Sequence, residues 1–97
     1  MKKIEVSRQA DEIQHRFFDA MNMLISQGNL DGLQTFCRRY GLNRPKYSNL
    51  RVMITTGRSS ASYKYIDIEA LSHLVKDYGI DAEWLLTGSG GMFKKSK

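Results

Sequence analysis

The chain of 97 residues lacks what several classes of protein require. Its one cysteine excludes an internal disulfide, and one cysteine with two separated histidines excludes a zinc finger. No apolar run approaches the roughly 18 residues of a membrane span, and residues 1–6 hold no apolar stretch long enough for a signal peptide. With 41% apolar and 26% charged residues, we expect a single folded domain in the cytoplasm.

Acidic side chains are missing from more than a third of the chain. The 35 residues from Gly32 to Ile66 contain no Asp or Glu but seven Lys or Arg, a local net charge of +7. The other 62 residues carry eight basic and ten acidic side chains, so the overall charge of +5 is a local excess. A basic block without acids favours a surface that faces a polyanion, and charge alone leaves a solvated basic face as the alternative.

Five segments have the apolar spacing of short helices, at about residues 11–27, 31–40, 44–56, 68–78 and 82–87. The N-caps expected for the last four are Asp31, Asn43, Asp67 and Asp81. A glycine stands at the end of each segment, where a left-handed residue stops a helix. We therefore predict an all-α bundle of about five short helices over residues 11–88. Residues 1–10 are the expected N-terminal arm and 89–97 the expected flexible basic tail.

Residues 33–52 form a helix-turn-helix candidate, two helices joined by about four residues around a glycine. Cys37 is small enough for the position where the helices cross, and a redox sensor is the less favoured reading. Gly41 suits the positive φ of the turn, while Tyr47 and Leu50 anchor the second helix from behind. The side chains left to point outward are Arg44, Pro45, Ser48, Asn49 and Val52.

These outward side chains suit the major groove of double-stranded DNA. Arg pairs with guanine, Asn pairs with adenine, and Val or Pro contacts the thymine methyl group, so we predict that all five read bases. Basic side chains around them are expected to bind phosphates, which fixes position but carries little sequence information. The predicted phosphate contacts are Arg38, Arg39, Lys46, Arg51, Arg58 and Lys64.

Several stretches match one known pattern, namely residues 16–18, 33–41 and 78–88 (YGIDAEWLLTG), followed by Gly90, Met92 and Phe93. On these residues, the chain from Arg16 through Phe93 resembles the helix-turn-helix domain of bacteriophage CI-type repressors, in the lambda-repressor-like superfamily. The ending from Trp84 to Gly88 is similar to the close of this domain in many phage-type repressors. The resemblance implies a transcriptional regulator of phage or mobile-element type.

The resemblance also implies how such a protein would act. It would bind as a homodimer to a two-fold symmetric operator. Members of the superfamily often begin the first motif helix with a glutamine aimed at a phosphate; here Leu33 holds that place, and Gln34, which follows it, is the expected phosphate contact. Larger repressors of this type carry a second domain for oligomerisation or self-cleavage, and we expect none in this chain.

No constellation of side chains predicts catalysis, a cofactor, a metal or a small-molecule substrate. Ser72, His73 and Asp77 share one expected helix and cannot converge as a triad. Residues 88–91 lack the Gly-Lys-Ser/Thr of a phosphate loop. Trp84 fits either a core anchor or a dimer contact. We expect no enzyme, and the alternative to a DNA-binding regulator is a protein-interaction or antitoxin-like module on the same fold.

Overall fold

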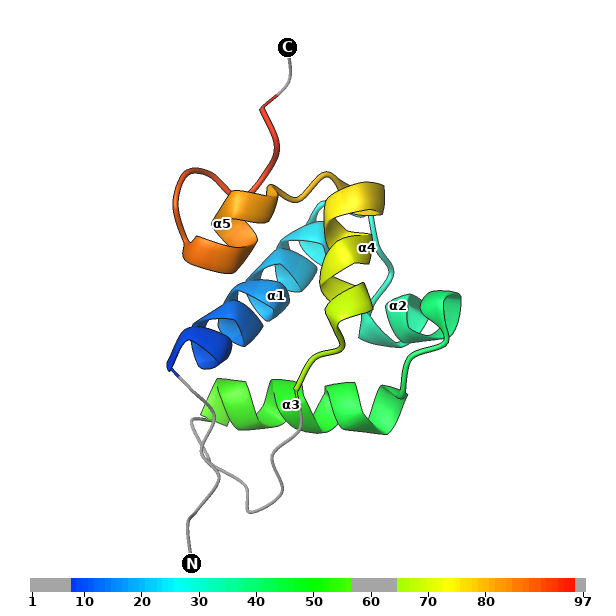
Figure 1. The fold of residues 1–97 in the computed structure, drawn as a ribbon. Coiled ribbons are helices and arrows are strands. Elements are labelled where there is room, and N and C mark those ends of the chain that lie inside the picture. Colours follow the sequence, from blue (N-terminus) through cyan, green and yellow to red (C-terminus); the bar gives the residue numbers. More distant parts are fainter. Residues whose placement is uncertain (1–7, 57–64, 96–97) are drawn as a thin grey trace, which may run out of the picture.

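The computed structural model describes residues 8–56 and 65–95, which form five α-helices and contain no β-strand. The helices are α1 (Arg8–Ser26), α2 (Leu33–Tyr40), α3 (Arg44–Thr56), α4 (Ile68–Tyr78) and α5 (Ala82–Thr87) (Figure 1). The predicted all-α bundle of short helices is thus confirmed. Because α1 begins at Arg8, it already includes the end of the expected N-terminal arm. None of these helices is long and apolar enough to cross a membrane.

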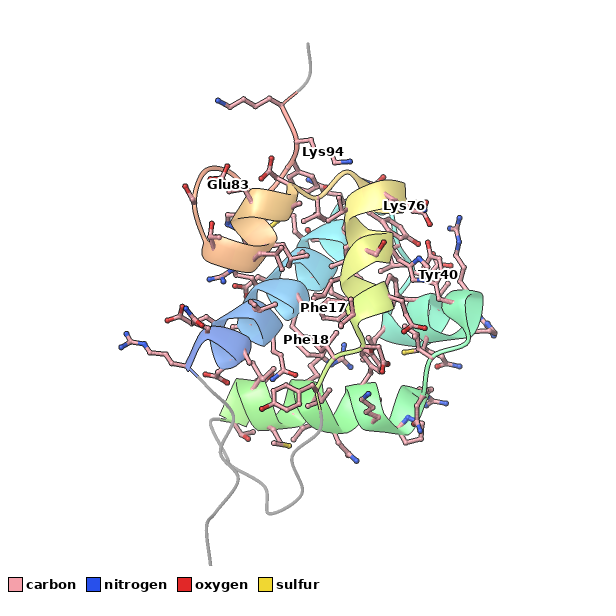
Figure 2. The ribbon with its side chains drawn as sticks, in the orientation of Figure 1. Phe17, Phe18, Tyr40, Lys76, Glu83 and Lys94 are labelled. Atoms are coloured by element: carbon pink, nitrogen blue, oxygen red, sulfur yellow. The ribbon has the colours of Figure 1, made fainter. Side chains whose placement is uncertain are left out.

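The core is organised around Phe17 of α1, which is fully buried. Its ring contacts those of Phe36 in α2 and Tyr47 in α3, with centroids 5.9 Å and 6.0 Å away. Figure 2 shows Phe17 and Phe18 at the centre of the bundle, where α1 and α4 cross. These ring contacts pack α2 and α3 against the same residue of α1. In Figure 1, α3 lies along the bottom of the molecule, and α1, α2 and α4 lie above it.

Two of the four expected N-caps are confirmed. Asn43 Oδ1 accepts a hydrogen bond of 3.0 Å from the backbone N–H of Lys46 at the start of α3. Asp81 Oδ1 accepts one of 2.9 Å from the backbone N–H of Trp84 at the start of α5. Each satisfies a donor that the first helical turn leaves free. Gly41 ends α2 with a φ of 66°, so only three residues join α2 to α3.

The other two expected caps form no cap bond. Asp31 does not open a helix, since α2 begins at Leu33 and no side chain caps it. Asp67 holds the N-cap position of α4, but its carboxylate makes no cap bond. That carboxylate instead binds Lys46 and Tyr47 of α3. The local rule fails at Asp67 because partners about twenty residues away take both oxygens.

The chain after α5 folds back onto the bundle, within the residues that the sequence assigned to a tail. Ile80 and Phe93 form an isolated antiparallel bridge. The backbone N–H of Lys94 donates to the carbonyl of Gly79 at 2.9 Å. Met92 and Phe93 pack, partly buried, against the core. These contacts hold the segment against the junction between α4 and α5.

Arg16 connects α1 to α5. Its Nε donates a 2.8 Å hydrogen bond to the carbonyl of Leu85. The last carbonyls of a helix have no partner inside it, and a guanidinium there also complements the negative end of the helix dipole. Trp84, which the sequence left open between a core anchor and a dimer contact, is half-buried against the core.

Candidate nucleic-acid interface

Two neighbouring rows of side chains run along the side of α3 that faces away from the core. The first row contains Arg44, Ser48 and Arg51, and the second contains Pro45, Asn49 and Val52. All three side chains of the second row are exposed, Val52 by 56%. Tyr47 and Leu50 are buried on the opposite side, as the sequence predicted. The outward face of α3 is therefore the one that we expected to read bases.

A hollow of about 470 Å³ lies between the beginning of α2 and the first row of α3. Five predicted contact residues line it, namely Gln34, Arg38, Arg44, Ser48 and Arg51. The structure thus brings together, from two helices, residues that the sequence assigned to phosphates and to bases. Asp31 also lines the hollow, so three guanidinium groups share it with one carboxylate.

The first turn of α2 adds to the positive potential of this hollow. Gly32 through Thr35 line it, and no side chain caps the helix there. The first N–H groups of a helix carry partial positive charge and lack partners inside it. Backbone donors and arginine side chains therefore face the same space, which is the arrangement that binds phosphate at helix N-termini.

Two predicted phosphate contacts have partners elsewhere in the chain. The guanidinium carbon of Arg39 lies 5.4 Å and 5.9 Å from the ring centroids of Tyr40 and Tyr78, on the side of α2 that faces α4. Lys46 Nζ lies 3.0 Å from Asp67 Oδ1. Neither side chain lines the hollow. The two remaining predicted phosphate contacts, Arg58 and Lys64, fall outside the described residues.

Lys46, Tyr47 and Asp67 form a polar cluster between α3 and the start of α4. The hydroxyl of Tyr47 donates to Asp67 Oδ2 at 2.8 Å and accepts from the backbone N–H of Asp67 at 2.9 Å. Hydrogen bonds from Lys46 and then from Tyr47 lower the pKa of the Asp67 carboxyl, while burial is the main reason that the pKa of Tyr47 is raised. Asp67 is therefore an ionised carboxylate that connects α3 to the start of α4.

Gln14 forms a second structural contact, after the Asp67 cluster, that the sequence did not reveal. It is a polar side chain of α1, only 5% exposed, and its Oε1 accepts a 3.0 Å hydrogen bond from the backbone N–H of Ile66. This bond holds the segment that leads into α4 next to Asp67. The apolar pattern of α1 gives no sign of it, because the partner lies 52 residues further along the chain.

A third group that the sequence missed joins the end of α2 to α4. The rings of Tyr40 and His73 stack with centroids 3.8 Å apart and planes 11° from parallel. The Tyr40 hydroxyl donates to Asp77 Oδ2 at 2.6 Å. Burial and then this hydrogen bond raise the pKa of Tyr40. In Figure 2, Tyr40 lies between α2 and α4, so the group braces α2 from the side away from α3.

Cys37 occupies the helix crossing that the sequence assigned to a small residue. It is 1% exposed, and burial raises the pKa of its thiol. In residues 8–56 and 65–95, no three His, Cys, Asp or Glu side chains gather closely enough to hold a metal ion. No known protein family, curated protein or solved structure matches the chain.

Proposed function

We propose that this chain is a sequence-specific regulator of transcription that binds double-stranded DNA, of the phage-repressor type, with α3 in the major groove. One observation carries the proposal: contact residues predicted from the sequence meet, from two helices, around one cationic hollow beside an exposed helix face. The resemblance of residues 16–93 to the CI-type repressor domain supports the same function.

Within the proposal, the two rows of α3 have different tasks. Arg44, at the start of α3, and Asn49, five residues further on, are the side chains able to form bidentate bonds with guanine and adenine. Pro45, Ser48 and Val52 contact the neighbouring base edges. The hollow behind them receives the backbone, so the side chains that line it and that the sequence assigned to phosphates bind phosphate there. Those phosphate contacts are Gln34, Arg38 and Arg51.

The proposal extends to a homodimer on a two-fold operator. A single α3, of 13 residues, is about 20 Å long and can cover only one half-site. Leu86 of α5 is 49% exposed and is the apolar side chain that we assign to the dimer contact. Analytical ultracentrifugation of the free protein and of its DNA complex tests this; a single protein copy in both would contradict it.

Selection from a random duplex pool, followed by fluorescence anisotropy, tests base reading. Duplexes that the wild type enriches should bind Arg44→Ala and Asn49→Ala more weakly, each by about 1–3 kcal/mol, because a bidentate base contact is lost. This is about a 5- to 150-fold rise in Kd. The control is Lys76→Ala, which removes an exposed charge from the end of α4 that lies away from α3 (Figure 2). Its affinity should stay near that of the wild type.

Two outcomes would contradict the proposal in different ways. If Arg44→Ala and Asn49→Ala both keep wild-type affinity and sequence preference, α3 does not read bases. If the wild type binds neither random nor genomic duplexes at moderate salt, the protein-interaction or antitoxin-like module becomes the better interpretation. Binding by the proposed surface should weaken steeply with added salt, because each phosphate contact releases counterions.

A further inference from the structure

Lys46 lies at a position of α3 from which an unpaired lysine could bind a DNA phosphate. It is in the first turn of α3, directly after Arg44 and Pro45. A lysine stem is long and flexible, and a lysine at the edge of a groove usually reaches a phosphate as a point charge. Its side chain is nevertheless only 18% exposed, because it turns toward the start of α4.

Asp67 holds Lys46 in this position through a cluster that restricts every member. Lys46 Nζ lies 3.0 Å from Oδ1 and 5.7 Å from the centroid of the Tyr47 ring. The second carboxylate oxygen and the backbone N–H of Asp67 both bind the hydroxyl of Tyr47. Tyr47 is fully buried, so the carboxylate is aimed by a side chain that cannot swing away.

From this geometry we propose that Asp67 limits the affinity of the protein for DNA of any sequence, because it pairs with Lys46 and withholds that lysine from the DNA backbone. The inference rests on the proposed function. A phosphate contact strengthens binding to every sequence alike, whereas base contacts strengthen binding to the operator alone. Keeping one cation of the first turn paired inside the protein therefore lowers affinity for all DNA sequences by the same factor and leaves the base-reading rows of α3 unchanged.

The experiment measures the salt dependence of binding to a fluorescein-labelled duplex of random sequence, by anisotropy over a series of KCl concentrations. Asp67→Asn keeps an acceptor for Tyr47 but removes the charge that holds Lys46. The freed lysine should add one phosphate contact and steepen the slope of log K against log salt by about 0.9. One such contact changes K by about 3.5-fold for each fourfold change in salt. The preference for a selected duplex over the random one should stay unchanged, because the added contact strengthens binding to both alike.

A matched set of variants separates this effect from a change in net charge. Asp77→Asn removes the same charge from the other end of α4, where Asp77 also accepts a tyrosine hydroxyl, that of Tyr40. It should leave the slope unchanged. Lys46→Met alone should also leave the slope unchanged, and adding Lys46→Met to Asp67→Asn should return the slope to the wild-type value.

Three results would overturn the inference. One is a slope for Asp67→Asn no steeper than that for Asp77→Asn. Another is a slope that flattens by about 0.9 in Lys46→Met alone, since that lysine would then already bind phosphate. The third is a steeper slope that persists in the double variant. Loosening of the fold does not imitate the expected result, because it weakens binding without adding a phosphate contact, and circular dichroism checks the fold of each variant.

The failure of this inference is distinct from the failure of the proposed function. If the wild type binds no duplex at any salt concentration, the proposed function fails and the inference fails with it. If the wild type binds DNA and Arg44→Ala weakens that binding, but Asp67→Asn leaves the slope unchanged, only the role of Asp67 is refuted.

Discussion

Replacing Tyr47 with phenylalanine tests how much the hydrogen bonds between Tyr47 and Asp67, which connect α3 to α4, contribute to the free energy of unfolding. Tyr47 is fully buried, and its ring packs against Phe17 with centroids 6.0 Å apart. Phenylalanine keeps the ring and removes only the hydroxyl, so no large cavity opens in the core. What is lost is the 2.8 Å bond to the Asp67 carboxylate and the 2.9 Å bond from the Asp67 backbone N–H.

The magnitude follows from those two bonds. A hydrogen bond to a charged group contributes about 1.5–3 kcal/mol, and a backbone donor left without a partner costs about 1–3 kcal/mol when buried. Asp67 is 35% exposed at its side chain, so water can replace part of both bonds. We therefore expect Tyr47→Phe to lower the free energy of unfolding by about 2–4 kcal/mol, a large share of the roughly 5–15 kcal/mol that stabilises a domain.

Urea denaturation followed by circular dichroism measures this loss, and thermal unfolding gives a second value. For a chain of this size, each kcal/mol lowers Tm by about 4–8 °C. Tyr40→Phe is the control, because it also removes a tyrosine bond to an aspartate, the 2.6 Å bond to Asp77, but at an exposed site. It should cost only about 0.5–1 kcal/mol. If both variants lose the same small amount of stability, the claim that Asp67 and Tyr47 tie α3 to α4 is refuted.

Two further predictions concern stability. Arg16→Ala should lower the free energy of unfolding by about 1.5–3 kcal/mol, since it removes a charged donor from the carbonyl of Leu85. An unchanged urea midpoint would show that α5 packs against α1 without this bond. Asp67 has a lowered pKa, so its contribution is present above the ordinary value of 3.8 and is lost as the pH falls through the still lower value in the folded protein. Urea midpoints measured from neutral to acid pH should therefore fall more for the wild type than for Asp67→Asn, and parallel curves would contradict this.

Local rules were sufficient for the helices because their causes lie close together in the chain. The spacing of Phe17, Met21 and Leu24 defines one apolar face, and all three are buried as that face requires. Gly41 ends α2 because its left-handed conformation has little steric cost. The cap at Asp81 forms because the first turn of α5 offers the nearest donor. In each case the decisive contact spans no more than one or two turns.

The residues that the sequence misassigned or missed have partners far along the chain. Asp67 has the residue type and position of an N-cap, but α3 supplies stronger donors than the first turn of α4 does. Gln14 reads as a surface residue until Ile66 is brought against it. Pairings of this kind depend on how the helices pack, which apolar spacing does not specify.

The candidate interface likewise has features that local spacing predicts and features that depend on distant partners. Arg44, Ser48 and Arg51 share a row because they are spaced by one and two turns of one helix, so their common face could be predicted. Charge alone could not distinguish these residues from Arg39 and Lys46. Those two also lie in the basic stretch, but they pair with groups on α4 or at its N-cap.

The burial of Cys37 gives the protein an internal reporter of its own opening. Thiol reagents attack the thiolate, and burial both covers this sulfur and raises its pKa. Since the chain has no other cysteine, the rate at which it reacts with such a reagent reports how often the packing around Cys37 opens. A ligand that bridges α2 and α3 makes such openings rarer, so the labelling rate can be used to detect binding without a fluorophore on either partner.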